Sequence, residues 1–157
     1  MDLAIVSASF KIWPPLKMKV LRKYRDFLIG GSRFAALKGK PVSLETLSAY
    51  PWISLPSETI TGNFLNAYFS SHGLAFSPEM ELATTDMILP AVRHNLGIGF
   101  LPQEFAAEDL KSGAVFEIDV EEALPERSIL LIYDTDYPQS IAAREFQKFL
   151  HERSEQA

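Results

Sequence analysis

Short runs of apolar residues alternate along the chain with segments in which apolar residues recur every three or four positions. The runs are typical of buried strands, and the wider spacing is typical of amphipathic helices. We expect strands at about 2–6, 20–29, 52–55, 79–83, 98–101, 114–118 and 127–133. We expect helices at about 43–48, 62–72, 84–96, 102–110 and 140–152. Because strands alternate with helices, the pattern predicts an α/β fold with a largely parallel sheet covered by helices.

Several of the expected helix boundaries carry local signals. Ser43 is placed to cap the first helix, Gly73 stops the second, and Asn95 ends the third. Pro90 falls inside the third helical pattern, where its missing N–H should bend or loosen the first turns. Pro102 suits the first turn of the fourth helix.

Composition narrows the classes of function. The 157 residues include no cysteine, which excludes disulfides, thiolate metal sites and cysteine nucleophiles. The formal net charge of −5 argues against broad nucleic-acid binding by this chain. The N-terminus has an acid at Asp2 and no basic segment, so it does not read as a secretory signal peptide. No apolar run approaches the ~20 residues that a membrane-spanning helix needs. We therefore expect a soluble cytoplasmic protein that does not contact a membrane.

Basic residues are concentrated near the start of the chain. Nine of the fifteen Lys and Arg residues lie between Lys11 and Lys40. They form either a basic arm that binds phosphate or the solvated edge of a strand and its loop. The second interpretation is favoured because Leu21 and Phe27 interrupt the charges, and lysines on an edge strand discourage pairing between sheets.

The residues for catalysis or metal binding do not converge. Ser57 sits in a suitable loop, but His72 lies about 15 residues further along one helix, or about 22 Å at helical rise. His94 and His151 complete the histidines, and no pair has metal-ligand spacing. The Gly97-Ile98-Gly99 stretch follows a helix and opens a strand, the reverse of a phosphate-binding loop. We expect no catalytic set, no metal and no cofactor.

Two hydroxyl-rich loops follow expected strands and lead into helices. Residues 55–61 contain Ser57, Thr59 and Thr61, and residues 83–86 contain Thr84 and Thr85. In open α/β sheets ligands bind beyond the carboxyl ends of the strands, and free N–H groups at a helix N-terminus suit anions. The hydroxyls form either a shared ligand cleft or simple helix caps and turns.

A carboxylate complicates the ligand-cleft interpretation. Glu58 lies in the first of the two loops. It would either repel an anion or recognise an amino or cationic group on the ligand.

Four segments in order resemble the effector-binding region of LysR-type transcription regulators. They are the strand Asp2–Val6, the link Lys40–Leu47, the stretch Asp86–Pro102 and the final amphipathic helix. The resemblance extends from Asp2 to about Glu152. No single segment is diagnostic, but their order and spacing together are specific.

The resemblance implies a periplasmic-binding-protein type II-like fold with two α/β lobes and an effector held between them. It implies effector contacts from the loop after the first strand, the Ser/Thr loop of the second lobe and the other strand ends. On this chain the matching positions are Ser7, Ser57, Glu58, Thr59, Thr61, Thr84 and Phe100.

The chain departs from the family pattern at its start. A complete regulator has a winged helix-turn-helix, a linker helix and further elements of lobe one ahead of Asp2. We expect residues 1–17 to be a remnant of lobe one, 18–136 a complete second lobe, and 137–157 a helix that returns to lobe one. The partial lobe should expose apolar surface, covered by self-association or by rearrangement.

The resemblance implies a regulatory module and not an enzyme. We expect it to bind a small anionic or zwitterionic metabolite, to form a homodimer or higher homo-oligomer, and to reach DNA only through a missing N-terminal domain. A solute-binding protein of a transport system and an enzyme on the same two-lobed scaffold are the alternatives.

Overall fold

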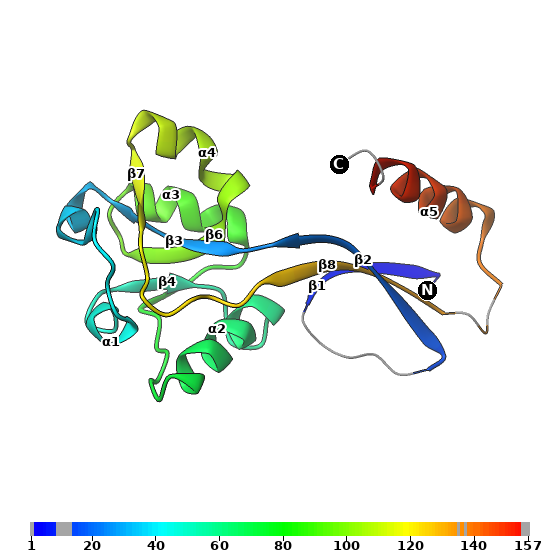
Figure 1. Ribbon diagram of the computed structural model, residues 1–157, viewed down its shortest axis with the longest axis horizontal. Coiled ribbons are helices and arrows are strands. Elements are labelled where there is room, and N and C mark those ends of the chain that lie inside the picture. The colour runs from blue at the N-terminus through cyan, green and yellow to red at the C-terminus, as the bar shows by residue number, and fades with distance from the viewer. Residues whose placement is uncertain (1, 9–13, 135, 137, 155–157) are drawn as a thin grey trace. The chain divides into compact units, whose positions relative to one another are not determined.

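The structure is a computed structural model that describes residues 2–8, 14–134, 136 and 138–154. The chain divides into two units (Figure 1). The large unit is Arg25–Pro125, and the small unit is formed by the chain before and after it.

The large unit is built on a five-stranded sheet in the order β5-β4-β6-β3-β7. Its strands are β3 (Asp26–Gly31), β4 (Trp52–Ser54), β5 (Met80–Glu81), β6 (Ile98–Pro102) and β7 (Val115–Ile118). The strand β4 is parallel to β5 and β6, whereas β3 is antiparallel to β6 and β7. The expectation of a largely parallel sheet is therefore wrong. The alternation of strands and helices predicted the elements, but β3 inserts between two later strands and runs against them.

Helices cover both faces of this sheet (Figure 1). They are η1 (Ser32–Leu37), α1 (Leu44–Leu47), α2 (Ile60–Ser71), η2 (Thr85–Met87), α3 (Ile88–Arg93) and α4 (Gln103–Ser112). Alternate residues of each strand enter opposite clusters, as the pleat requires. Trp52 packs with α1 and α2, and its neighbour Ile53 packs with α3 and α4. The helix-covered sheet has a core on each side.

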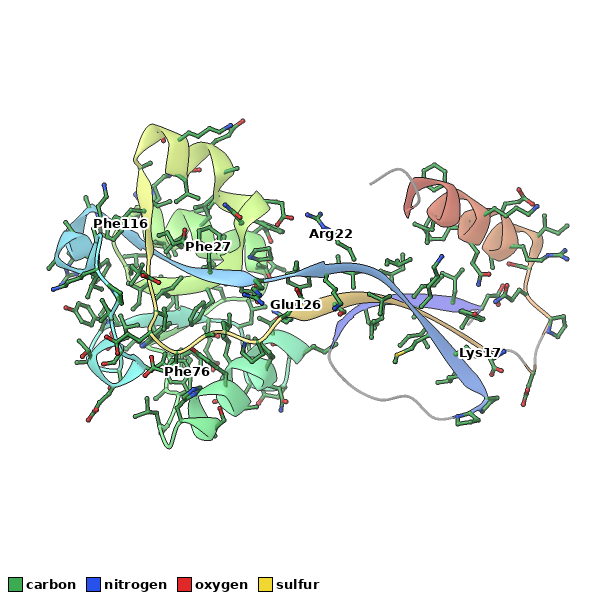
Figure 2. The ribbon with its side chains drawn as sticks, viewed as in Figure 1. Lys17, Arg22, Phe27, Phe76, Phe116 and Glu126 are labelled. Carbon is green, nitrogen blue, oxygen red and sulfur yellow. The ribbon has the colours of Figure 1, made fainter. Side chains whose placement is uncertain are left out.

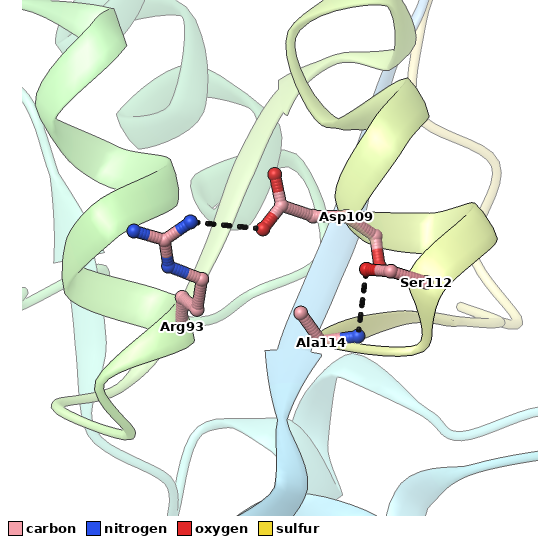
Figure 3. Close-up of polar contacts among 4 residues, drawn as sticks. All are labelled: Arg93, Asp109, Ser112 and Ala114. Carbon is pink, nitrogen blue, oxygen red and sulfur yellow. Dashed lines mark hydrogen bonds and ion pairs between the residues drawn. The ribbon is translucent and has the colours of Figure 1, made fainter.

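An ion pair joins α3 and α4, the two helices that pack on the Ile53 side of the sheet. Arg93 of α3 contacts Asp109 of α4 at 3.3 Å, and the Ser112 hydroxyl accepts from the Ala114 N–H where α4 ends (Figure 3). Arg93 is half exposed, so the pair adds little to the free energy of unfolding.

Most of the local boundary signals are confirmed. The Ser43 hydroxyl accepts from the Thr46 N–H at the start of α1. Asn95 has φ 62°, the left-handed conformation that ends α3. Pro102 does not enter a first turn as expected, because β6 continues through it and α4 begins at Gln103. Pro90 lies in the first turn of a helix shorter than predicted, where an N–H has no partner within the helix.

The small unit is a three-stranded antiparallel sheet with one helix. The order is β1 (Leu3–Ala8), β8 (Arg127–Asp134) and β2 (Leu16–Tyr24), and the helix is α5 (Ile141–Ser154). The single strand expected at 20–29 is two strands, β2 and β3, which separate at Arg25 and enter different sheets. Both β2 and β8 thus belong to the small unit, whereas the expected limits at 18 and 136 placed them in the second lobe. In the part of the chain that the structure describes, no helix could span a bilayer.

Candidate functional site

The candidate site of the large unit is the edge of its sheet where three strands end. Because β4, β5 and β6 run in the same direction, their carboxyl ends lie at one edge. The antiparallel β3 begins at this edge, with Asp26 opposite Pro102. The predicted residues at 57–61 follow β4, Thr84 follows β5, and Phe100 lies on β6. The topology therefore collects these positions on neighbouring strands.

The loop after β4 is tied to the start of α2. The Thr59 hydroxyl accepts from the Gly62 N–H at 3.0 Å and donates to the Pro56 carbonyl at 2.7 Å. Gly62 allows this close approach, because a Cβ there would lie 2.1 Å from the Pro56 carbonyl oxygen. Thr59 is thus the N-cap of α2, and its hydroxyl is used by the fold.

Ser57 lines a hollow of about 290 Å³ beside this loop. The lining residues come from β4, α2, the segment before β5 and β5 itself: Leu55, Ser57, Asn66, Phe76, Ser77, Pro78 and Glu81. Of the predicted residues, Ser57 alone lines this hollow. Glu58 is exposed, and Thr61 is partly buried in the first turn of α2.

Sequence reasoning missed three polar residues of the hollow. Asn66 lies on α2, Ser77 precedes β5, and Glu81 ends β5. A carboxylate near the end of the strand expected at 79–83 was a usable signal for Glu81, since ligands bind beyond the carboxyl ends of strands. No comparable local signal marked Ser77.

Phe100 lies in a separate hollow. Its ring is buried and stacks on Trp52, with ring centroids 5.6 Å apart. The second hollow, of about 150 Å³, is lined by Phe100 and by residues of β3, β7 and the segment after β7. Its carboxylates are those of Asp26, Glu117, Asp119 and Glu122. The structure therefore does not bring Ser57 and Phe100 into one hollow of the large unit.

The segment after β7 is fastened to α1 and α2. The Glu122 carboxylate accepts from the Leu44 N–H at 2.8 Å, and the Tyr68 hydroxyl donates to the Glu122 carbonyl at 2.8 Å. Val42 donates to the Asp119 carbonyl and accepts from the Glu121 N–H. Burial raises the pKa of Tyr68 to about 12, and the negative charge of Glu122 adds to this shift.

Thr84 remains exposed at the end of the β5 loop. It precedes η2, and its side chain makes no capping hydrogen bond there. The Thr84 carbonyl accepts from the Met87 N–H at 3.2 Å, which closes the turn of η2. Of the hydroxyls weighed as helix caps, that of Thr84 does not cap η2.

Ser7 belongs to the small unit. Its hydroxyl makes a hydrogen bond with the Tyr24 hydroxyl and accepts from the Arg127 guanidinium at 3.1 Å. That guanidinium is buried and lies 5.3 Å from the centroid of the Tyr24 ring. Sequence reasoning missed Tyr24 and Arg127, although an arginine directly before the most apolar strand of the chain was a signal.

The described residues do not assemble a catalytic or metal site. His72 and His94 lie at the C-terminal ends of α2 and α3, and the hydroxyl-rich loop of Ser57 lies before the other end of α2. Among residues 2–8, 14–134, 136 and 138–154, no group of three His, Cys, Asp or Glu could hold a metal ion. The two hollows at this edge are lined by neutral hydrogen-bonding groups, by carboxylates and, in the second hollow, by Arg25.

The fold and these hollows define a ligand-binding α/β protein of two units. The chain belongs to the LysR substrate binding domain family, which it matches over residues 1–155. The domains of this family have the periplasmic-binding-protein type II-like fold.

Solved structures show the same fold at low sequence identity. The regulatory domain of CcmR from Synechocystis PCC6803, in complex with 2-PG, has a TM-score of 0.81 and 19% identity, and the match covers 98% of this chain and 73% of that one. The effector binding domain of QuiR in complex with shikimate has a TM-score of 0.79 and 17% identity, over 99% and 72% of the two chains.

Curated relatives are transcription regulators of greater length. YeiE of Escherichia coli (strain K12), an uncharacterized HTH-type regulator, is 36% identical over 80 residues, which cover 51% of this chain and 27% of that protein. The activator CmpR of Synechocystis is 29% identical over 128 residues, covering 82% of this chain and 42% of that protein. The chain thus spans less than half the length of these regulators and about three-quarters of the solved domains.

Proposed function

We propose that this chain is the effector-binding regulatory part of a LysR-type transcription regulator and has no chemistry of its own. The observation that carries the proposal is the hollow at the carboxyl edge of the large sheet, in a chain that matches the family over residues 1–155. Two of the similar regulatory domains were solved in complex with small ligands, 2-PG and shikimate. A small metabolite is the corresponding effector here.

The regulator acts in the cytoplasm as a homodimer or higher homo-oligomer, and it contacts DNA through a domain outside this chain. A ligand that prefers one arrangement of the units shifts the population of the protein toward it. The large unit is a whole second lobe and the small unit is part of the first. The apolar surface of the small unit supports this assignment, since its sheet is covered less completely than that of the large unit.

The effector contacts come from the predicted set Ser7, Ser57, Glu58, Thr59, Thr61, Thr84 and Phe100. Ser57 is the member best supported, because it lines a hollow. Thr59 contributes by holding the loop in place, since its hydroxyl is engaged within the fold.

A thermal-shift screen of the 157-residue chain against carboxylic acids, amino acids and sugar phosphates tests this function. We expect one class to raise the melting temperature, because a ligand that binds only the folded state stabilises it. Ser57→Ala should weaken the affinity roughly fivefold, the worth of about one hydrogen bond. The matched control is Ser70→Ala, an exposed serine on α2 that lines neither hollow.

Two results contradict the proposal. Turnover of a bound compound would show an enzyme. Binding that Ser57→Ala and Ser70→Ala weaken equally would place the ligand elsewhere.

A further inference from the structure

The hollow beside Ser57 is lined from both clusters of the large sheet, by Leu55 of one and by Phe76 beside the other. In the parallel pair of β4 and β5, Ile53 is opposite Met80 and Ser54 is opposite Glu81. Ile53 and Met80 belong to the cluster packed with α3 and α4. Because the side chains of a strand alternate, Ser54 and Glu81 face the other side, which α2 covers.

A buried hydroxyl lies on this face. Ser54 is 1% exposed, and its Oγ has no hydrogen-bond partner among the described residues. Buried hydroxyl groups in folded proteins nearly always have a partner. The next residue, Leu55, and the strand partner, Glu81, both line the hollow. Ser54 itself does not line the hollow, and the polar lining residues on this side are Asn66, Ser77 and Glu81.

The lining of the hollow has one charge. Glu81 is the charged residue of the set, and Ser57, Asn66 and Ser77 are neutral hydrogen-bonding residues. A carboxylate at the site disfavours a simple anion and favours a cationic group such as an ammonium. The N-terminus of the twelve-residue α2 follows Ser57, and the helix dipole gives this end a partial positive charge, opposite to that of Glu81. The two polarities together suit a ligand that carries both charges.

Apolar walls and size limit the ligand further. Leu55, Phe76 (labelled in Figure 2) and Pro78 line the same hollow. Phe76 packs on Phe69 with ring centroids 4.5 Å apart. The volume of about 290 Å³ is at the lower limit of about 300–1,000 Å³ found for sites of drug-sized ligands. The exposed lining is more polar than apolar, so a small molecule with a short apolar part fits it.

We propose that this hollow binds a free α-amino acid, with its ammonium group at Glu81, its carboxylate toward the start of α2, and its side chain against Phe76. The proposal rests on the proposed effector-binding function and names its ligand class. Asn66 and Ser77, which line the hollow, supply the neutral hydrogen bonds.

Calorimetric titration of the 157-residue chain with each common L-amino acid tests the proposal. The best-binding amino acid is then compared with its N-acetyl derivative, which lacks the ammonium, and with its amide, which lacks the carboxylate. We expect each derivative to bind at least about tenfold more weakly, as the loss of a charge-assisted hydrogen bond implies.

Variants of the chain test whether the ammonium group of the ligand lies at Glu81. Glu81→Gln should weaken the amino acid about tenfold and leave the N-acetyl derivative unchanged. The matched control is Glu79→Gln, an exposed acid two residues away that does not line the hollow. Ser77→Ala should weaken binding of the ligand without lowering the melting temperature of the free chain, because Ser77 lines the hollow and is exposed. A purely structural serine would lower that temperature.

The outcomes separate this inference from the proposed function. If no amino acid binds, or if the N-acetyl derivative binds as tightly as the parent, the inference is wrong. Equal effects of Glu81→Gln and Glu79→Gln also overturn it. If a carboxylic acid or sugar phosphate instead binds in a Ser57-dependent way, the effector-binding function stands and its ligand class is different.

Discussion

The two units of this chain bury their apolar side chains to different degrees. In the large unit, helices pack on both faces of the sheet and form two buried clusters. In the small unit, the buried apolar residues among those described are Leu130, Leu131 and Ala143. Its exposed apolar residues include Met18 and Val20 on β2 and Phe146 and Phe149 on α5, each between 40% and 48% exposed. A sheet must bury its apolar face against another layer, and the small unit has one helix for this purpose.

Apolar side chains of the small unit are thus exposed, and the assignment of this unit to part of a lobe stays a prediction. What covers these side chains also stays a prediction. We expect the large unit to contribute most of the free energy of unfolding. We expect the solvent exposure of the small unit to depend on what contacts it.

The largest expected effect comes from the core of the large unit. Phe69 is 1% exposed and contacts the rings of Trp52, Tyr68 and Phe76. Phe69→Ala should lower the free energy of unfolding by about 3–5 kcal/mol. The matched change in the small unit, Phe149→Ala, should cost less than about 1 kcal/mol, because that ring is 48% exposed. Urea denaturation followed by circular dichroism measures both. Equal losses would show that the two units do not differ in packing.

An intermediate effect is expected where the segment after β7 is fastened to α2. Tyr68→Phe removes the hydrogen bond to the Glu122 carbonyl and should cost about 1 kcal/mol at neutral pH. The pKa of Tyr68 is raised from 10.0 to about 12, so the folded chain keeps the proton longer than the unfolded chain. Its contribution to stability is complete below pH 10 and is lost as the pH rises toward about 12.

Melting temperatures between pH 9 and pH 12 check this dependence on Tyr68. Tyr68→Phe should show a shallower alkaline loss of stability than the original chain. Tyr50→Phe is the control, and it should keep the original slope. A Tyr68→Phe variant with an unchanged slope would contradict the assignment.

The smallest effect on stability is expected at the exposed face of β2. Replacing Met18 and Val20 together by threonine should change the free energy of unfolding by no more than about 0.5 kcal/mol, because both side chains are already exposed. The same change should reduce the binding of an apolar fluorescent dye and any self-association measured by sedimentation. The control is Leu96→Thr, an exposed residue of the large unit. If the control reduces dye binding more than the β2 change, the apolar surface of the small unit is not the one in contact with the dye.

Local structure could be predicted closely from the sequence. The helix expected at 62–72 is observed at Ile60–Ser71, and the strand expected at 127–133 is Arg127–Asp134. The cap at Ser43 is also as predicted. These features depend on residues within about one turn or strand of each other, so the periodicity and a few capping residues suffice.

The candidate site was predicted only in part. Ser57 was identified because a hydroxyl loop between a strand and a helix is a local pattern. Asn66, Ser77 and Glu81 come from three further segments, and their meeting depends on how β5 pairs with β4. The predicted residue Phe100 lies at another hollow, because its ring is buried in the aromatic cluster with Trp52.

The sequence by itself determined the elements, their caps and the family of this chain, since each of these is carried by the order of nearby residues. Only the tertiary structure decided that β3 runs against its neighbours, that β2 and β3 separate at Arg25, and that Glu81 joins Ser57 around one hollow. The reason is physical. Strand pairing joins residues far apart in the chain, and its energy comes from the whole packed sheet and not from any one segment.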